Sequence, residues 1–200
     1  MKKLHESLQR GHEIGGNKPL RVTRRTFVKI GAMAAIAGLL PRPLFASNSN
    51  VPVAEKSLAL YHTHTGEKLN AIYWAEGNYL NDSLREINYI LRDPRDNEVH
   101  AIDPRLLDLL FAISEKIDAA RPFHVISGYR SPKSNAFLRA RSGGVAEKSL
   151  HLVGQAIDIR LPGRDTRSLQ RAATALQRGG VGYYPKSDFI HVDVGRVRYW

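Results

Sequence analysis

The chain has no cysteine among its 200 residues, so disulfide bonds cannot hold its fold together. It also lacks an apolar run of about 20 residues, the length that a helix needs to cross a bilayer. The Gly-x-Ser-x-Gly motif that carries the nucleophile of many serine hydrolases is absent, and so are internal repeats. Stability must therefore come from a hydrophobic core, and a bound metal would add to that stability. The absence of the Gly-x-Ser-x-Gly motif excludes a serine hydrolase.

Positive charge is distributed unevenly along the chain. The formal net charge is +11, and residues 1–46 contribute +7 of it, whereas residues 47–200 contribute only +4. A nucleic-acid-binding protein is expected to carry its basic residues within the folded domain rather than in a removable segment. We therefore exclude nucleic acid as a partner. Residues 47–200 are numerous enough to form one domain with a sizeable core.

Residues 1–46 have the layout of a cleavable export signal. The pair Arg24-Arg25 precedes an apolar run at 30–40, and prolines and small residues follow as far as Ala46. The run is small and apolar on all sides, which argues against an amphipathic surface helix. We predict export to the periplasm by the twin-arginine pathway, cleavage after Ala46, and a mature domain at 47–200 without a membrane span.

The spacing of apolar residues predicts helices early in the mature chain and strands at its end. Apolar positions recur with helical spacing between Leu80 and Arg92, and Asp103-Pro104 carries the capping signals of a second helix. The remaining predicted elements are a hairpin at 57–63 and 69–74, strands at 123–127, 156–160, 181–184 and 189–194, and helices at 135–141 and 166–178. This order indicates the α+β class.

Three side chains in the last third of the chain form a candidate metal site. His151 and Asp158 are seven positions apart, and His191 follows on a predicted strand. Two imidazole nitrogens and one carboxylate oxygen leave the fourth position of a tetrahedral zinc ion free for water. Such an open position is what a hydrolytic zinc site requires.

The alternation of strand side chains directs these residues toward a cleft. His191 and Asp193 share one face of the predicted strand at 189–194, and the apolar residues between and beyond them take the other face. Asp158 likewise faces away from the isoleucines on either side of it. Gly154 permits a turn between His151 and the strand that carries Asp158.

The motif Ser-x-His-x-x-Gly-x-Ala-x-Asp at 149–158, followed by His191, resembles the signature of the D-alanyl-D-alanine metallopeptidase branch of the lysostaphin and hedgehog-type zinc peptidases. The resemblance extends over 127–132 and 179–193, and with the twin-arginine leader it points to the murein endopeptidase K group. It implies one zinc ion held by the two histidines and the aspartate. It also implies a hedgehog/D,D-peptidase-like α+β fold whose small antiparallel sheet carries the zinc and is flanked by helices.

Metal-assisted hydrolysis of a peptide bond also needs a base that accepts a proton from water. Some relatives place a glutamate three residues before the last histidine, where this chain has Asp188. Asp193 shares a strand face with His191, and we favour it as the base. Its alternative role is to orient His191 by accepting the N–H of the other ring nitrogen.

Further residues are candidates for binding the substrate, which by resemblance comes from peptidoglycan stem peptides. Arg130 matches an arginine of the family, and its guanidinium would stabilise an oxyanion or hold a substrate carboxylate. Ser149 and Gln155 either orient the substrate or make ordinary loop hydrogen bonds. Three aromatic residues either line a peptide groove or complete the core: Tyr183, Tyr184 and Trp200.

Two functions stay open at this point. The first is a monomeric periplasmic zinc endopeptidase that cuts peptide cross-links of peptidoglycan, and Arg130 and Asp193 favour it. The residues do not decide between D,D- and L,D-bonds, or between endopeptidase and carboxypeptidase action. The second is a non-catalytic wall-binding or regulatory domain whose metal only holds the fold. A fourth protein ligand from His64 would favour this second function, although we expect His62 and His64 to lie at the surface.

Overall fold

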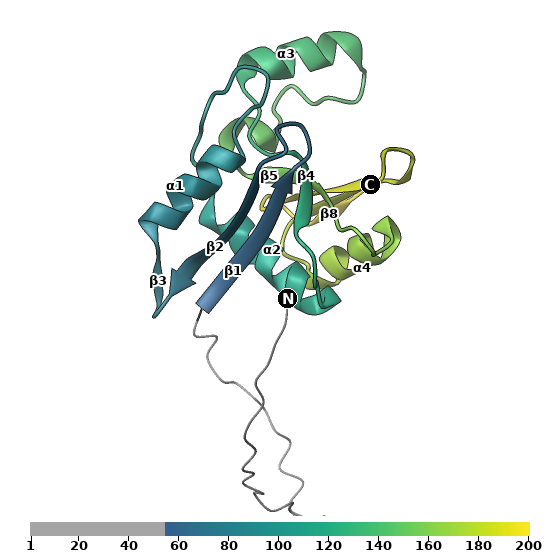
Figure 1. The fold of residues 1–200 in the computed structure, drawn as a ribbon. Coiled ribbons are helices and arrows are strands. Elements are labelled where there is room, and N and C mark those ends of the chain that lie inside the picture. The colour runs from purple at the N-terminus through teal and green to yellow at the C-terminus, as the bar shows by residue number, and fades with distance from the viewer. Residues whose placement is uncertain (1–54) are drawn as a thin grey trace, which may run out of the picture. The chain divides into compact units, whose positions relative to one another are not determined.

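An eight-stranded mixed sheet organises residues 55–200, the part of the chain that the computed structural model describes (Figure 1). The strand order is β3-β2-β1-β4-β5-β7-β6-β8. The predicted leader at 1–46 lies outside the described residues. The strands are β1 (Glu55–His62), β2 (Lys68–Ala75), β3 (Asn78–Tyr79), β4 (Phe123–Ser127), β5 (Ala156–Arg160), β6 (Gly180–Tyr184), β7 (Phe189–Asp193) and β8 (Arg198–Tyr199).

The sheet is large and mixed, which corrects the expectation of a small antiparallel sheet. β4 pairs with β1 in parallel and with β5 antiparallel, so it joins the N-terminal hairpin to the C-terminal strands. β8 adds a second parallel pair at β6. Pairing between strands that are far apart in the chain has no local sequence signal, so the pattern of apolar residues does not predict which strands are neighbours in the sheet.

The α-helices of the described region are α1 (Asn81–Ile90), α2 (Pro104–Ile117), α3 (Pro132–Arg141) and α4 (Thr166–Leu176), and two 3₁₀ turns are η1 (Leu150–Val153) and η2 (Pro185–Ser187). The predicted start of α2 is confirmed, because the Asp103 side chain accepts the backbone N–H of Arg105. α3 begins three residues earlier than predicted, since Ser131 caps it by accepting the backbone N–H of Ser134.

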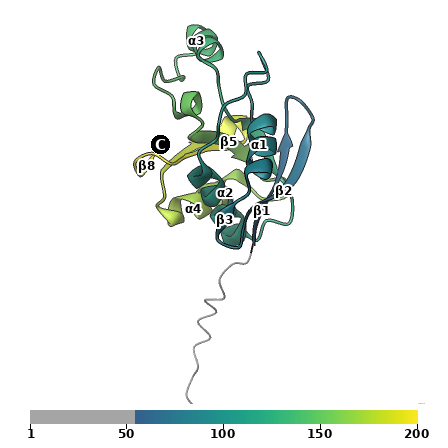
Figure 2. The same cartoon turned by 90° about the vertical axis from the view of Figure 1, so that its left-hand side faces the viewer.

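The core lies on one face of the sheet, under α1, α2 and α4. Figure 2 shows α1 and α2 on the same side of the β1–β2 hairpin, whereas α3 stands apart at the top of both views. The largest fully buried side chains come from strands and helices alike: Leu60, Tyr73, Ile87, Leu91, Leu106, Leu107, Leu110, Ile113, Phe123, Ile157, Ile159 and Leu169. None of the helices within residues 55–200 is long and apolar enough to cross a membrane.

Candidate metal centre

Asp158 and His191 lie directly opposite each other on the two central C-terminal strands. β5 and β7 are antiparallel, and their register pairs Asp158 with His191. The neighbours Ile157 and Ile159 are fully buried in the core, as is Ile190. The predicted alternation is therefore confirmed, and both polar side chains project from the face of the sheet opposite to the core.

His151 reaches the same place from η1, the 3₁₀ turn that precedes β5. The Ser149 hydroxyl accepts the backbone N–H of His151 at 3.4 Å and caps the start of this turn. Gly154 ends it in the left-handed conformation, with φ of 64°. A Cβ atom at Gly154 would lie 2.2 Å from the carbonyl oxygen of Ala101, so the close approach of the two backbones requires glycine.

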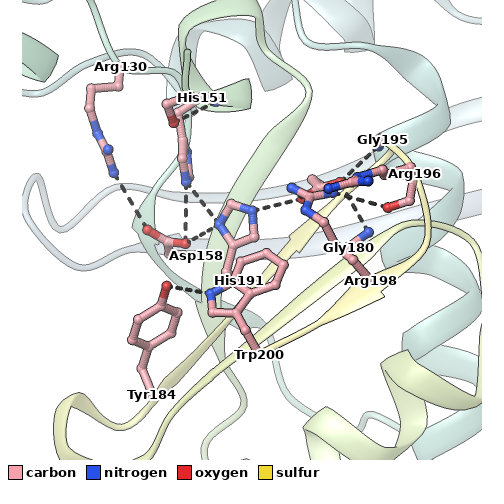
Figure 3. A network of polar contacts seen from close by, with 12 residues as sticks. Arg130, His151, Asp158, Gly180, Tyr184, His191, Gly195, Arg196, Arg198 and Trp200 are labelled. Atoms are coloured by element: carbon pink, nitrogen blue, oxygen red, sulfur yellow. Dashed lines mark hydrogen bonds and ion pairs between the residues drawn. The ribbon is translucent and has the colours of Figure 1, made fainter. Parts of the chain in front are cut away.

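The three side chains bring one ligand atom each into a small triangle (Figure 3). His151 Nε2 lies 3.2 Å from His191 Nδ1 and 3.3 Å from Asp158 Oδ1. The third side, from His191 Nδ1 to Asp158 Oδ1, is 2.9 Å. Ligands at the usual zinc distances in a tetrahedral site are about 3.3 Å apart, so the donor set and its spacing fit a metal ion of this kind. Within residues 55–200 this is the one such group of histidine and acidic side chains.

The second nitrogen of each imidazole is held by an acceptor outside the triangle. His151 Nδ1 lies 2.7 Å from the carbonyl oxygen of Gly128, and His191 Nε2 lies 3.1 Å from Asp193 Oδ2. A carbonyl or carboxylate oxygen only accepts, so these two nitrogens carry the protons in neutral imidazoles. The lone pairs of His151 Nε2 and His191 Nδ1 then point into the triangle, as metal ligands require.

Asp193 is fully buried on the side of His191 that faces away from the triangle. Its carboxylate also accepts hydrogen bonds from Arg198, at 2.7 Å, and from the backbone amides of Gly180 and Gly195, at 3.1 and 2.8 Å. Burial alone would raise the pKa of the Asp193 carboxyl, but the hydrogen bonds from His191, Arg198 and the amides hold it well below its ordinary value. These contacts match the alternative role of Asp193, which is to orient His191. The role of Asp193 as the base stays a prediction.

Asp188, the second candidate base, does not line the cleft that opens beside the triangle. It follows η2 in the left-handed conformation and is mostly exposed. Its carboxylate accepts a hydrogen bond from the Thr166 hydroxyl and lies 3.6 Å from the Arg160 guanidinium. These partners hold Asp188 away from the metal-ligand atoms.

Arg130 is buried beside Asp158, with its guanidinium largely without partners. Nη2 lies 3.7 Å from Asp158 Oδ2 and 3.3 Å from the Ser127 hydroxyl, and Nε has no hydrogen-bond partner among the described residues. Burial lowers the pKa of the guanidinium, and the charge of Asp158 opposes this shift. A desolvated cation with unused donors is suited to binding an anionic group.

The loop between α1 and α2 holds the segment that carries Arg130. The backbone N–H of Tyr129 donates to the carbonyl oxygen of Leu91 at 2.8 Å. The N–H of Ser131 donates to the buried carboxylate of Asp93 at 2.9 Å. Because Tyr129 and Ser131 flank Arg130 in the chain, these two bonds fix the backbone from which the guanidinium extends.

A cleft of about 490 Å³ opens beside the triangle. Arg130, Lys148 and Arg198 line it, and Asp158 is its one acidic residue among the described part of the chain. Sequence reasoning found neither Lys148 nor Arg198, because nothing in their neighbourhood distinguishes them from solvent-exposed cations. Arg198 is paired with the buried Asp193 and Arg130 lies beside Asp158, so Lys148 is the cation of the lining without an acidic partner among the described residues. Its charge favours a ligand that carries carboxylates.

Of the other residues predicted to contact the substrate, some line the cleft and others do not. Ser149, Tyr184 and Trp200 line the cleft. Gln155 does not, because its amide N–H donates to the Asp103 carboxylate at 3.2 Å and so contacts the start of α2. Tyr183 points to the other face of β6 and packs against the core.

His62 and His64 lie at the β1–β2 turn, outside both the triangle and the cleft. His62 is fully buried, which corrects the expectation of a surface position. Its Nδ1 accepts the backbone N–H groups of His64 and Thr65, each at 3.3 Å, so the ring closes the turn from inside. His64 is not part of the metal-ligand group, so it does not provide the fourth ligand that would favour a purely structural metal.

An α+β fold whose mixed sheet carries a His-Asp-His centre beside a cationic cleft is typical of the metallopeptidase class. The family model described as Peptidase_M15_2, Peptidoglycan L,D-endopeptidase MepK, matches residues 51–200, and the chain belongs to this family. The Peptidoglycan L,D-endopeptidase MepK of Escherichia coli (strain K12) is 40% identical over 177 residues, which cover 88% of this chain and 96% of the relative. The Probable peptidoglycan L,D-endopeptidase MepK of Haemophilus influenzae (strain Rd) is 36% identical over 178 residues, or 88% and 95%.

Proposed function

We propose that this protein is a zinc-dependent peptidoglycan endopeptidase that hydrolyses peptide cross-links of the cell wall in the periplasm. The observation that carries this proposal is the triangle of His151, Asp158 and His191, open to a cationic cleft. The relatives named L,D-endopeptidases support it. In an L,D-bond the carbonyl group belongs to an L-configured carbon. D-alanine does not provide such a carbon, so the proposed substrate is the cross-link between two diaminopimelate residues.

The three residues of the triangle would hold the metal ion, with the tautomers fixed by Gly128 and Asp193. The chemistry that zinc supplies at such a centre is Lewis acidity, which lowers the pKa of a bound water toward about 7 and polarises the scissile carbonyl. Asp193, through its hydrogen bond to His191, keeps that ring in the orientation that ligation needs.

Arg130 would bind the substrate from the side of Asp158. Its unused N–H donors suit either the oxygen that gains charge in the transition state or a free carboxylate of the stem peptide. Lys148 lines the same cleft and adds to the attraction for the several carboxylates of a cross-linked peptide. Ser149 is available at the cleft wall, although its hydroxyl oxygen already caps η1.

A muropeptide profile tests the proposal. Cross-linked peptidoglycan is incubated with the purified zinc-loaded protein, and His151→Ala serves as control after its fold has been verified by circular dichroism. We expect loss of cross-linked dimers with the wild type alone, and the masses of the products identify the bond. An unchanged profile with a folded, metal-loaded wild type would contradict catalysis and favour a wall-binding or regulatory domain.

The sequence of residues 1–46 supports export by the twin-arginine pathway, and we propose that the mature protein starts at Ser47. Mass spectrometry of the protein recovered from the periplasm checks this. Replacing Arg24 and Arg25 together by lysine keeps the charge and is expected to prevent export. Unprocessed protein at full length in the wild type would contradict the proposed cleavage.

A further inference from the structure

Tyr184 and Trp200 form a hydrogen-bonded pair at the wall of the cleft, next to His191 (Figure 3). The indole Nε1 of Trp200 lies 2.9 Å from the hydroxyl oxygen of Tyr184. An indole N–H only donates, so the phenol oxygen is the acceptor and its own proton points elsewhere. Within residues 55–200 this O–H has no acceptor, so the phenol keeps a free donor in the cleft.

The backbone holds both rings of the pair in place. β6 pairs with β7 so that Gly182 lies opposite His191, on the face of the sheet that carries the triangle. A Cβ atom at Gly182 would lie 2.7 Å from the Trp200 ring, so glycine leaves the space that the indole fills. The indole then lies against the His191 imidazole, with 5.4 Å between the ring centroids.

Tyr184 is fixed from the other side by Phe189. These residues are partners in the β6–β7 register, and their rings stack with 4.7 Å between centroids and 19° between planes. The phenol therefore has little freedom to turn away. Arg130 and Tyr184 both line the cleft, and Figure 3 shows them on the same side of the triangle as Asp158.

We propose that Tyr184 is a catalytic hydrogen-bond donor, whose O–H binds the carbonyl oxygen of the scissile bond as that oxygen gains negative charge. Trp200 is a positioning residue, because its N–H occupies the phenol oxygen and directs the O–H into the cleft. Tyr184 and Arg130 then supply two donors from the protein to the same region. This inference rests on the proposed function, since it assigns a role in that same cleavage reaction.

The test compares the full-length zinc-loaded wild type with Tyr184→Phe, using purified cross-linked muropeptide dimers. Loss of one donor to a developing oxyanion lowers kcat by about 100- to 1,000-fold. Because the contact strengthens in the transition state, we expect KM to change little. Tyr183→Phe is the matched control: it removes the same atom from the neighbouring residue, whose ring faces the core, and should leave kcat unchanged.

Trp200→Phe keeps an aromatic ring but removes the N–H. We expect a smaller fall in kcat, and no further fall when it is combined with Tyr184→Phe, because Trp200 acts through that phenol. Zinc affinity and melting temperature should match the wild type in all variants. An additive double variant would contradict the positioning role, and unchanged kcat in Tyr184→Phe would overturn the assignment of Tyr184. A wild type that leaves the dimers intact would instead overturn the proposed function and this inference together.

Discussion

The two candidate roles of Asp193, orienting His191 and acting as the base, predict opposite results for the zinc affinity and activity of one variant. Asp193→Asn retains an oxygen that accepts the His191 N–H but removes the charge that Arg198 and two amides surround. If Asp193 orients His191, zinc affinity should fall by about 10- to 100-fold, and saturating zinc should restore most of the activity. Titration against a fluorescent chelator measures the affinity.

The opposite outcome would identify Asp193 as the base. In that case Asp193→Asn would bind zinc as tightly as the wild type and would stay inactive at saturating zinc. Asp188→Asn is the matched control, because Asp188 contacts Thr166 and Arg160 outside the cleft. It should retain both zinc affinity and kcat.

Arg130→Lys separates the charge of this side chain from its geometry. Lysine keeps the cation but lacks the planar fork of N–H donors, so we expect kcat/KM to fall by about 100-fold or more. The measurement is the steady-state cleavage of muropeptide dimers. Arg171→Lys, at an exposed position on α4, should leave kcat/KM unchanged. Equal rates for Arg130→Lys and the wild type would show that the charge of Arg130 suffices.

At this scale the grouping of the three candidate ligands was predictable, and the side chains that support them were not. His151 and Asp158 occupy a motif with fixed spacing, His191 follows on a strand, and strand alternation predicted the faces of Asp158 and His191. The partners of Asp193 and Gln155 are different, because each depends on how the chain folds: Arg198 is five positions from Asp193 and reaches it across the turn between β7 and β8, and Asp103 is 52 positions from Gln155. Arg198 and Asp103 meet these side chains only in the folded chain.

The α1–α2 loop links stability to pH through Asp93. Burial would raise the pKa of this carboxyl, but hydrogen bonds from Ser134 and from the amides of Arg95 and Ser131 outweigh burial and lower the pKa. A lowered folded-state pKa contributes stability that is present above the unfolded value of about 3.9 and is lost as the pH falls through the folded value.

Asp93→Asn should therefore be less stable than the wild type at pH 7, and the difference should shrink as the pH falls below about 4. Urea unfolding at several pH values measures both free energies. A difference that is the same at pH 7 and at a pH well below about 3.9 would show that the charge of Asp93 does not contribute.

The left-handed conformation of Gly154, in the turn that follows His151, leads to a prediction about stability. Gly154→Ala combines the strain of a left-handed residue with a collision against the Ala101 carbonyl. Gly66 has a similar φ of 77° but no atom within 4 Å of the added Cβ, so Gly66→Ala isolates the strain, about 1–2 kcal/mol. Urea unfolding should show a clearly larger loss for Gly154→Ala. Equal losses would mean that the neighbouring backbone moves aside.

Most elements were predictable because their signals are local. The strand at 156–160 has the predicted bounds, and the Asp-Pro pair predicts the start of α2. α4 ends at Leu176, two residues before the predicted end, because Gln177 adopts the left-handed conformation. A glutamine gives no signal for such an end, since glycine or asparagine usually occupies this position.

In residues 55–200 taken together, the hydrophobic core and the candidate metal centre lie on different faces of the sheet. Three helices and the apolar strand residues fill one face of the sheet, and the triangle lies on the other. We therefore expect the protein to stay folded without metal. Zinc at 100 times its dissociation constant should add about 2.7 kcal/mol to the free energy of unfolding.

Thermal unfolding with zinc and with a chelator checks this expectation. The wild type should unfold cooperatively in both conditions, at a higher temperature with zinc, and His151→Ala should show no zinc-dependent rise. A wild type that loses its cooperative transition on chelation would show that the metal is needed for folding.

The α+β class was predictable from the order of the elements, whereas the size of the sheet was not. Parallel pairing of β1 with β4 connects segments about sixty residues apart, and neither strand shows in its sequence which partner it takes. The family resemblance supplied the substrate class, which composition and periodicity do not contain.

Placement of the core and the triangle on opposite faces has a practical consequence. A variant that is silenced at the triangle keeps the packing that maintains the domain and the cations that line the cleft. Such a protein would bind its cross-link without cutting it. Labelled with a fluorophore, an inactive form would serve as an imaging reagent for the cross-links that the active enzyme removes.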